Sequence, residues 1–257
     1  HTRYIGDWSS DVCSSDLFSY NNNGTFTSIN EGGAVYIYNY NNATGLYGVE
    51  SDLNIVPNRY QENFRLILSN PESKDWFGWS MDIYGNYLLI GSNQRNVSPA
   101  TTGKAHIYKY NGSTWNYIKN LSISDSVNND EYGHAVAIND TFAFVSSAIH
   151  DNNKGAVYIY KKDEGGTDNF GYITKIMLKN PSPNDYFGYS ISTNNTNLIV
   201  GAIKNENQPG QAYLIEYNST NDTWGAVVDS NLTNETSIVR GVDRIEAQGD
   251  SFGASVS

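Results

Sequence analysis

The chain has 257 residues, a formal net charge of −11 and only 17% charged residues. The acidic balance argues against nucleic acid or an anionic membrane as a partner, because neither attracts a negative protein, and no apolar run is long enough for a transmembrane helix. Polarity comes instead from 34 Asn with Ser, Thr and Gly, while 20 Tyr and 9 Phe supply aromatic rings. Aromatic residues favour strands, and Asn and Gly favour tight turns. The composition therefore predicts an all-β fold.

The first 17 residues differ in amino-acid composition from the rest of the chain. They hold the only cysteine, Cys13, which can form no internal disulfide and which has Asp11 and Asp16 nearby, a poor setting for a reactive thiolate. The stretch DWSSDVCSSDL at 7–17 resembles a translated sequencing adapter. We therefore interpret residues 1–17 as an adapter-derived artefact that is not structured. The genuine protein is expected to begin near Phe18.

A repeat runs through the rest of the chain. Its first signature is an aspartate followed two residues later by an aromatic–glycine pair: DWFG at 75–78, DEYG at 130–133, DYFG at 185–188 and DSFG at 250–253. The glycines of these pairs are 55, 55 and 65 residues apart. A second signature contains glycine, alanine and aromatic residues, at 33–40, 103–110, 155–162 and 210–217. A third is an aromatic residue after a polar turn: Trp115, Phe170 and Trp224.

Each copy of the repeat predicts four short strands with turn residues between them. The stretch after the aromatic–glycine pair alternates, as in Ser190-Ile191-Ser192, and a tight turn follows it. An apolar run such as 198–202 is the second strand, the second signature is the third, and the Trp or Phe opens the fourth. Four-stranded units of this period are typical of β-propeller blades. We therefore expect a β-propeller of four-stranded antiparallel blades.

The copies divide residues 18–257 into the blades of a single domain. Complete blades are expected at about 74–128, 129–183 and 184–247. Residues 18–73 keep only the later strands of a first blade, and 248–257 begin a fifth. Since propellers close with about four to eight blades, this organisation predicts a fragment with three complete and two partial blades. The alternative is that the last strand pairs with the first half-blade and closes a small ring.

The recurring residues have expected structural roles. The aromatic residue can fill the gap between neighbouring sheets, and the glycine permits close backbone approach or a positive φ. The aspartate can accept hydrogen bonds from the amides of the turn. We expect blade packing rather than catalysis from this set, which comprises Asp75, Phe77, Gly78, Asp130, Tyr132, Gly133, Asp185, Phe187, Gly188, Asp250, Phe252 and Gly253, with Trp115, Phe170 and Trp224.

The order D-x-F-G-x-S, V-G-A and G-x-A-Y-x-x-x-Y resembles the FG-GAP repeat, most clearly over 185–224. FG-GAP repeats build the propellers of integrin α-subunits and many bacterial surface proteins, and the short form of about 55 residues is the most similar. The resemblance implies an extracellular or cell-surface protein that takes part in adhesion or recognition.

One departure from the integrin pattern concerns calcium. Where integrins carry a D-x-D-x-D-G-x-x-D loop, this chain has only IYGN, IND and STNNTN, which are tight turns with almost no carboxylates. The loop 148–155 offers Asp151 with Asn152 and Asn153 but no second carboxylate. Calcium takes most of its affinity from carboxylates. We therefore expect no metal and no cofactor, although calcium is the one ion that the resemblance suggests.

No strong catalytic motif is found among the common hydrolase, phosphate-binding and thiol patterns. His134 takes a position that Trp79 and Tyr189 fill in other copies, and His106 replaces an aromatic residue of the third strand. We expect both histidines to pack rather than to catalyse. Acids from different blades that meet at a central channel remain an open alternative.

Two functions follow from these observations. The first is a non-enzymatic extracellular or cell-surface propeller that binds protein or glycan through variable loops such as 93–102 and 205–209. The second is the propeller portion of a larger secreted carbohydrate-active enzyme, which loops rich in acids or histidine would favour. The loops carry Asn, Gln, Ser and Thr, which favours binding. No catalytic residue is assigned, the ligand-binding residues are unknown, and neither nucleic acid nor membrane insertion is expected.

The sequence also contains eleven Asn-x-Ser/Thr sequons. In a protein secreted by a eukaryote these asparagines can carry N-linked glycans, but the same tripeptides are good hairpin turns. We favour the turn interpretation. The sequons begin at Asn23, Asn42, Asn96, Asn111, Asn120, Asn139, Asn194, Asn218, Asn221, Asn231 and Asn234.

Overall fold

The computed structural model of the chain describes residues 32–37, 64–94, 102–125, 127–203 and 210–225, Ser255, and the short strands named below. The adapter-like segment 1–17 and the motif at 250–253 lie outside the described residues. Several short strands pair with one another near the start of the chain: β1 (Ser19–Tyr20) with β2 (Phe26–Thr27), β4 (Tyr40–Asn41) with β5 (Leu46–Tyr47), and β6 (Val49–Glu50) with β7 (Tyr60–Gln61).

Three antiparallel sheets follow the three repeats, with their strands in chain order. Blade 2 contains β9 (Phe77–Tyr84), β10 (Tyr87–Ser92), β11 (Lys104–Tyr110) and β12 (Trp115–Leu121). Blade 3 contains β13 (Val136–Ile138), β14 (Phe142–Ser147), β15 (Ala156–Lys162) and β16 (Phe170–Ile176). Blade 4 contains β17 (Phe187–Thr193), β18 (Asn197–Ala202), β19 (Gln211–Asn218) and β20 (Thr223–Trp224). Before them, β3 (Val35–Ile37) pairs with β8 (Phe64–Leu66) and forms blade 1.

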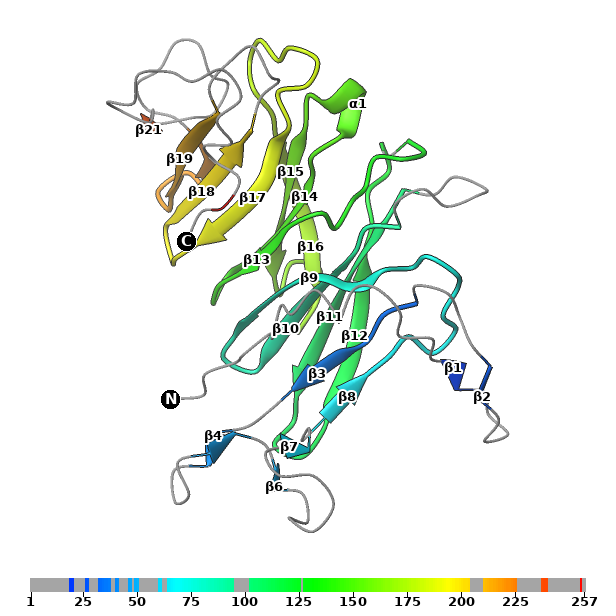
Figure 1. Cartoon of the computed structure of the whole chain (residues 1–257). Helices are drawn as coiled ribbons and strands as arrows, with labels where there is room; N and C mark the ends of the chain where they lie inside the picture. The colour runs from blue at the N-terminus through cyan, green and yellow to red at the C-terminus, as the bar shows by residue number, and fades with distance from the viewer. Residues whose placement is uncertain are drawn as a thin grey trace.

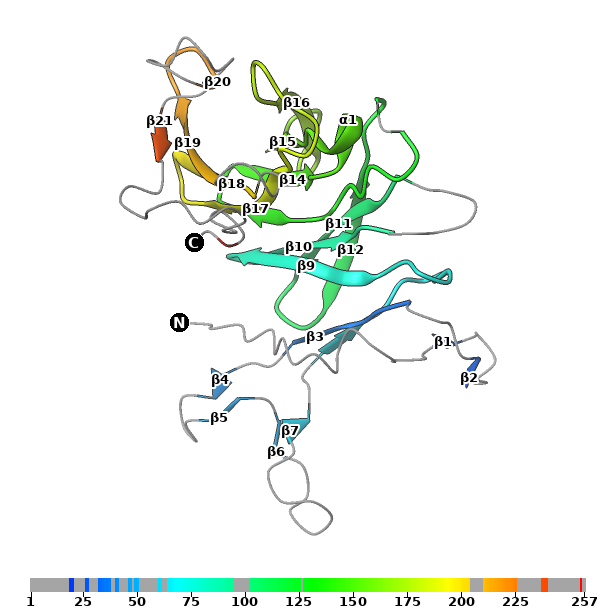
Figure 2. The same cartoon turned by 45° about the horizontal axis from the view of Figure 1, so that its top comes forward.

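The blades follow one another along an arc, each with one face against its neighbour (Figures 1 and 2). The first strand of blade 3, β13, contacts the first strands of both neighbours, β9 and β17. The first strands therefore lie on the inner side of the arc, and each fourth strand lies at the outer edge of its sheet. The structure confirms the predicted all-β fold, with four-stranded antiparallel blades arranged as part of a β-propeller.

Blade 4 explains why its motif spacing is longer than that of the others. Its fourth strand comes in two pieces, because β20 pairs with the end of β19 and a later strand, β21 (Ser237–Val239), pairs with the beginning of β19. Val239 pairs with Ala212 as Leu121 pairs with Ala105 in blade 2. The extra residues of this repeat therefore interrupt one strand and leave the order of the sheet unchanged.

The core lies between the blades rather than inside any one of them. In β14, Phe142 and Phe144 pack in the cluster between blades 3 and 4, whereas Ala143 and Val145 pack in the cluster between blades 2 and 3. Successive side chains of a strand point to opposite faces. A strand that is covered on both faces therefore reads as a continuous apolar run, which is why the second strands show no alternation.

The antiparallel order gives the propeller two distinct ends. The turn end carries the connections between first and second strands and between third and fourth strands, at 85–86, 111–114, 139–141, 163–169, 194–196 and 219–222. The loop end carries the connections between second and third strands and between successive blades, such as 122–135 and 148–155. Among the described residues the only helical segment, α1 (His150–Asn153), lies in the latter loop. Its backbone is left-handed, with φ of 49° at Asp151 and 65° at Asn152, a conformation that Asp and Asn tolerate well.

Recurring ion pairs join the blades at the turn end. Lys109 of blade 2 lies 2.7 Å from Asp168 of blade 3, and Lys161 of blade 3 lies 2.6 Å from Asp222 of blade 4. Both lysines hold the same position in the second signature, and both aspartates stand two residues before the aromatic of the fourth strand. The hydrogen bonds from Lys109 and Tyr87 lower the pKa of Asp168. Being partly exposed, each pair contributes about 1 kcal/mol or less.

Candidate functional site

The motif aspartate closes a turn at the loop end of each described blade. Its Oδ2 atom accepts a hydrogen bond from the amide three residues earlier, which belongs to Glu72, Val127 or Ser182, at 2.6, 2.8 and 2.7 Å. The residues on either side of the aspartate have positive φ in all three blades, near 66° before it and near 50° after it: Lys74 and Trp76, Asn129 and Glu131, Asn184 and Tyr186. The carboxylate therefore holds a strained backbone at the entry to the first strand.

The motif aromatic lies buried behind this turn, against a ring of the third strand. The ring centroids are 5.4 Å apart for Phe77 and His106, 5.5 Å for Tyr132 and Tyr158, and 5.4 Å for Phe187 and Tyr213. The glycine that follows the aromatic has φ of 91°, 90° and 89° in the three blades, at Gly78, Gly133 and Gly188. Such φ values favour glycine.

The same aromatic residue also joins its blade to the preceding one through the backbone. The amide of Tyr132 donates to the carbonyl of Thr102 at 2.8 Å, and Gly103 forms a parallel bridge with Tyr132. In the next joint the amide of Phe187 donates to the backbone carbonyl of Lys154 at 3.1 Å. The first and second signatures therefore meet at one point, where successive blades touch.

The aromatic residues that open the fourth strands are buried as well. Phe170 packs against Tyr87 of the preceding blade, with ring centroids 5.6 Å apart, and Trp224 lies 5.1 Å from Phe144. Trp115 lies 5.3 Å from Tyr110 in its own blade. Among the predicted motif residues, Asp250, Phe252 and Gly253 lie outside the described residues. The others lie at the joints between blades.

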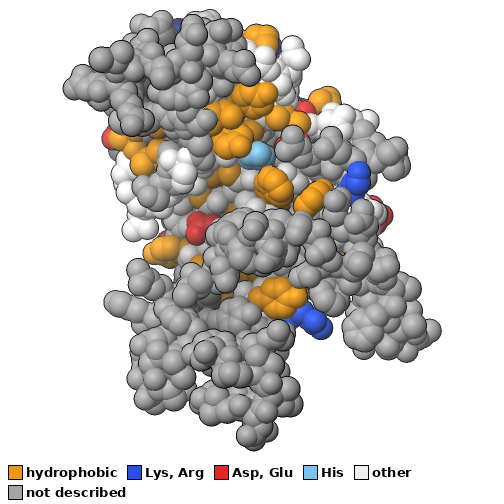
Figure 3. All heavy atoms as spheres, in the orientation of Figure 1, with side chains coloured by type: hydrophobic (Ala, Val, Ile, Leu, Met, Phe, Trp, Pro, Cys, Tyr) orange, Lys and Arg blue, Asp and Glu red, His pale blue; other side chains and the backbone are white. Residues whose placement is uncertain are grey.

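A row of rings crosses the inner strands at the position after the motif glycine. Trp79, His134 and Tyr189 come from consecutive blades, with ring centroids 6.2 Å apart for the first pair and 5.0 Å for the second. His134 Nδ1 also lies 3.4 Å from Glu131 Oε2. All three rings are half-buried. The space-filling view in the same orientation as Figure 1 shows hydrophobic side chains gathered around a histidine over the described strands (Figure 3).

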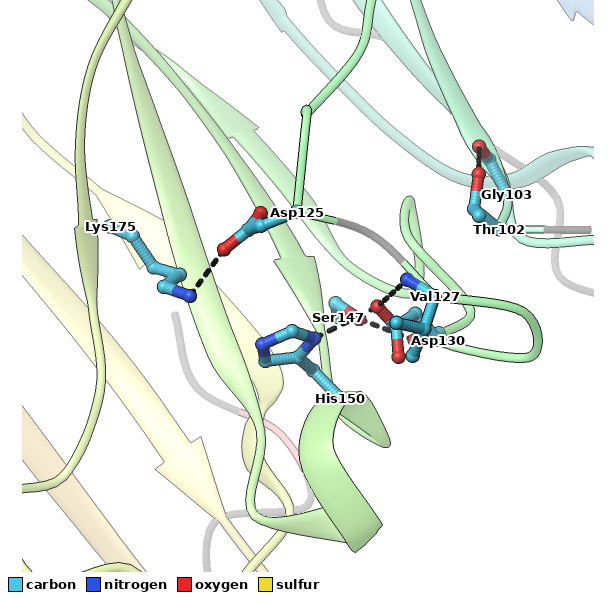
Figure 4. A network of polar contacts seen from close by, with 8 residues as sticks. All are labelled: Thr102, Gly103, Asp125, Val127, Asp130, Ser147, His150 and Lys175. Carbon is cyan, nitrogen blue, oxygen red and sulfur yellow. Dashed lines mark hydrogen bonds and ion pairs between the residues drawn. The ribbon is translucent and has the colours of Figure 1, made fainter.

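A polar network occupies the loop end between blades 2 and 3 (Figure 4). Asp130 Oδ2, which closes the motif turn, also lies 2.8 Å from His150 Nδ1. The hydroxyl of Ser147 donates to the backbone carbonyl of Asp130. The other ring nitrogen of His150 points toward the ion pair of Lys175 and Asp125, whose Nζ and Oδ2 atoms are 2.5 Å apart.

A pocket of about 390 Å³ lies beside this network, lined by Ser122, Ile123, Ser124, Asp125 and Tyr172. The segment that begins at Ser122 belongs to blade 2 and leads into blade 3, whereas Tyr172 stands on β16 of blade 3 with 53% of its surface exposed. Partial burial opposes ionisation of Asp125, but the hydrogen bond from Lys175 and the charges of Lys175 and His150 together hold its pKa below 3.8. The pocket therefore offers an aromatic face, two hydroxyls and an ionised carboxylate.

The profile of the FG-GAP repeat matches three segments of the chain, 60–108, 115–160 and 170–215. The chain belongs to the FG-GAP repeat family. No curated protein matches it with significant similarity.

Each FG-GAP repeat is offset from the blade to which it contributes. The match over 115–160 begins at β12, the last strand of blade 2, and ends within β15, the third strand of blade 3. One repeat therefore contributes strands to two blades, and the contact between Gly103 and Tyr132 joins residues of two successive repeats.

The neighbouring FG-GAP repeat shows which part of the polar network is general. In blade 2 a residue of the corresponding loop, Gln94, bonds the motif aspartate: its Nε2 donates to Asp75 Oδ1 at 2.5 Å. Ser92 likewise donates to the carbonyl of Asp75 as Ser147 does to that of Asp130. A glutamine cannot act as an acid or base, so the task shared by Gln94 and His150 is to hold the loop onto the motif aspartate.

Sequence reasoning did not find the pocket, because its members are Ser, Ile, Asp and Tyr residues with no motif of their own. The sequence signal is the recurrence of a tyrosine two residues after the aromatic of the fourth strand, at Tyr117 and Tyr172. Among the described residues, no group of three His, Cys, Asp or Glu side chains is arranged to hold a metal ion. In the same part of the chain, no helix has the length and apolar character needed to cross a membrane.

Proposed function

We propose that this FG-GAP chain is a non-enzymatic binding module of the extracellular space or the cell surface, which recognises a protein or glycan ligand at the loop end of its blades. The observation that carries the proposal is the pocket between blades 2 and 3. Tyr172 presents an exposed ring there, beside the carboxylate of Asp125 and the hydroxyls of Ser122 and Ser124.

The chemistry of this pocket suits recognition. Ligand sites combine apolar and aromatic walls with a few fixed polar groups, and exposed tyrosine is enriched where proteins bind partners. Lys175 and Asp125 hold one another in place at 2.5 Å and supply one cationic donor group and one acceptor at the rim. A ligand that carries both hydroxyl groups and an apolar face, such as a saccharide or a polar peptide loop, fits this set.

The FG-GAP resemblance to integrin α-subunits and bacterial surface proteins supports the extracellular location and the adhesive role. The acidic charge of the chain supports the same choice, because a formal charge of −11 disfavours nucleic acid as the ligand. Fold alone does not decide function, so the pocket must be tested directly.

The test uses the full chain on arrays of glycans and extracellular proteins, followed by titration of each ligand that binds. Tyr172→Ala should weaken binding about tenfold or more, which corresponds to about 1.4 kcal/mol. Tyr117→Ala is the matched control, because Tyr117 holds the same position in blade 2, is 54% exposed and does not line the pocket. Equal loss in both variants would place the ligand elsewhere. Hydrolysis of a polysaccharide with no binding on either array would contradict the proposal and favour the enzyme alternative.

A further inference from the structure

Five of the six sequon asparagines among the described residues lie at the turn end of the blades. Four of them lie in or beside tight turns of the turn end and are exposed: Asn111, Asn194, Asn218 and Asn221. A fifth, Asn139, lies in a turn at the same end but is only 3% exposed. Asn120 lies within β12. The sequons at 23, 42, 96, 231 and 234 lie outside the described residues.

The exposed asparagines build their turns with the side-chain oxygen alone. Asn111 Oδ1 accepts the amides of Ser113 and Thr114, each at 2.9 Å. Asn194 Oδ1 accepts hydrogen bonds from the amides of Thr196 and Asn197, at 3.0 and 2.8 Å. Asn218 Oδ1 accepts the amide of Thr220 at 2.9 Å. In every one of these turns the described hydrogen bonds leave the side-chain nitrogen unused.

Because the turn uses only the side-chain oxygen of the asparagine, the side-chain nitrogen can carry a glycan without breaking the turn. An N-linked glycan is attached to Nδ2 of asparagine, and the modified side chain keeps its carbonyl oxygen as an acceptor. The hydrogen bonds that close the turns at Asn111 and Asn194 therefore persist after modification. A sequon in such a turn presents its reactive nitrogen to solvent while its oxygen stabilises the hairpin.

Asn139 provides an internal contrast. Its Oδ1 closes a turn in the same way, accepting the amides of Thr141 and Phe142. Its Nδ2, however, donates to the carbonyl of Asn194 at 2.7 Å and to Thr193 Oγ1 at 3.2 Å, both in blade 4. A glycan on this nitrogen would replace an inter-blade hydrogen bond and would have to occupy the joint between blades 3 and 4.

We propose that Asn111, Asn194 and at least one of Asn218 and Asn221 accept N-linked glycans when the chain passes through a eukaryotic secretory pathway, and that Asn139 does not. The glycans then cover the turn end of the blades. Glycans at these turn-end sites leave Tyr172 and the pocket beside it uncovered. The inference concerns modification and stands independently of which ligand the pocket binds.

The test is secretion of the full chain, behind a cleavable leader, from a eukaryotic host. The folded, secreted protein is treated with a peptide N-glycosidase in ¹⁸O water, and each released site is read by peptide mass spectrometry as a labelled aspartate. Labelling is expected at Asn111, at Asn194 and at one or both of Asn218 and Asn221, with the peptide of Asn139 unlabelled. Peptide-level reading separates these sites from the sequons outside the described residues.

Two variants make the outcome decisive. Asn111→Gln should remove one glycan from the protein, whereas Asn139→Gln should leave the number of glycans unchanged. Labelled Asn139 in the folded protein would overturn the proposal, because it would show that the joint between blades 3 and 4 accommodates a sugar. Unlabelled Asn111 and Asn194 would overturn it equally, by showing that the exposed nitrogens are not acceptors.

Discussion

A Cβ atom on Gly155 would lie only 2.0 Å from the backbone carbonyl oxygen of Phe187 in the next blade. The same relationship holds between Gly103 and Tyr132, where the distance would be 2.1 Å. Side chains do not approach a backbone this closely, so each joint between blades depends on a glycine that has no side chain to displace. The second signature of the repeat therefore begins with glycine because the next blade occupies the space beside it.

Replacing Gly155 with alanine should destabilise the protein more than a change of φ alone can explain. Gly112→Ala is the matched control, because Gly112 has φ of 99° with nothing within 4 Å of a new Cβ, while Gly155 has φ of 85°. The left-handed backbone should cost about 1–2 kcal/mol in both variants. The clash with Phe187 should add about 1–3 kcal/mol to Gly155→Ala. Urea denaturation measures both, and equal losses would contradict the contact.

His150 should be replaceable by glutamine but not by alanine. Gln94 already bonds Asp75 in the preceding blade as His150 bonds Asp130, so His150→Gln should change the free energy of unfolding by less than about 1 kcal/mol. His150→Ala leaves a buried carboxylate one partner short, which should cost about 1–3 kcal/mol. Chemical denaturation of the two variants checks this. If His150→Gln is as unstable as His150→Ala, the shared loop-holding role is wrong.

The buried ring of His106 should make stability depend on pH. Burial, aided by the charge of Lys104, lowers the pKa of His106 from 6.5 to about 4, and neither ring nitrogen has a hydrogen-bond partner among the described residues. Between these pH values the unfolded chain binds a proton that the folded chain does not. The free energy of unfolding should therefore fall as the pH falls from 6.5 to 4, by up to about 3 kcal/mol.

The variant His106→Tyr isolates this contribution, since Tyr158 and Tyr213 occupy the same position in the other blades. Denaturation midpoints of the two proteins are compared at several pH values between 4 and 7. The variant should lose much of the slope over this interval, because tyrosine does not titrate there. Identical slopes would show that other groups carry the pH dependence.

Calcium should not stabilise the blades. The turns at 85–86, 139–141 and 194–196 together hold one carboxylate, that of Asp140, where an integrin-type loop would need several. A folded-state site filled a hundredfold above its Kd would add about 2.7 kcal/mol. The melting temperature of the full chain is therefore expected to be the same in millimolar calcium and in a chelator. A rise of several degrees, with a stoichiometric heat of binding, would show that the chain holds calcium.

Much of the fold can be predicted from the sequence, because the same pattern of strands and turns occurs in three complete copies. The aspartate–aromatic–glycine pattern predicted where each blade begins, and the structure places β9 and β17 at Phe77 and Phe187. The split fourth strand of blade 4 was not predicted, since nothing in residues 225–239 distinguishes an interruption from a longer loop. The pocket was missed for a related reason. Ser122 and Tyr172 become neighbours only when blade 2 stands against blade 3.

The sequence by itself determined the blade and its strand order, because those features rest on turn residues and alternation that act within a few residues of one another. Only the tertiary structure decided which polar groups meet across a joint. In that structure Gln94 and His150 each bond a motif aspartate. Asp125, which pairs with Lys175, lines a pocket instead. The tertiary structure also separated Asn111 from Asn139, two sequons of equal appearance. The physical reason is that the neighbouring blade decides whether a side chain is exposed. A side-chain nitrogen is exposed or buried according to what packs against it, and the local sequence does not contain that information.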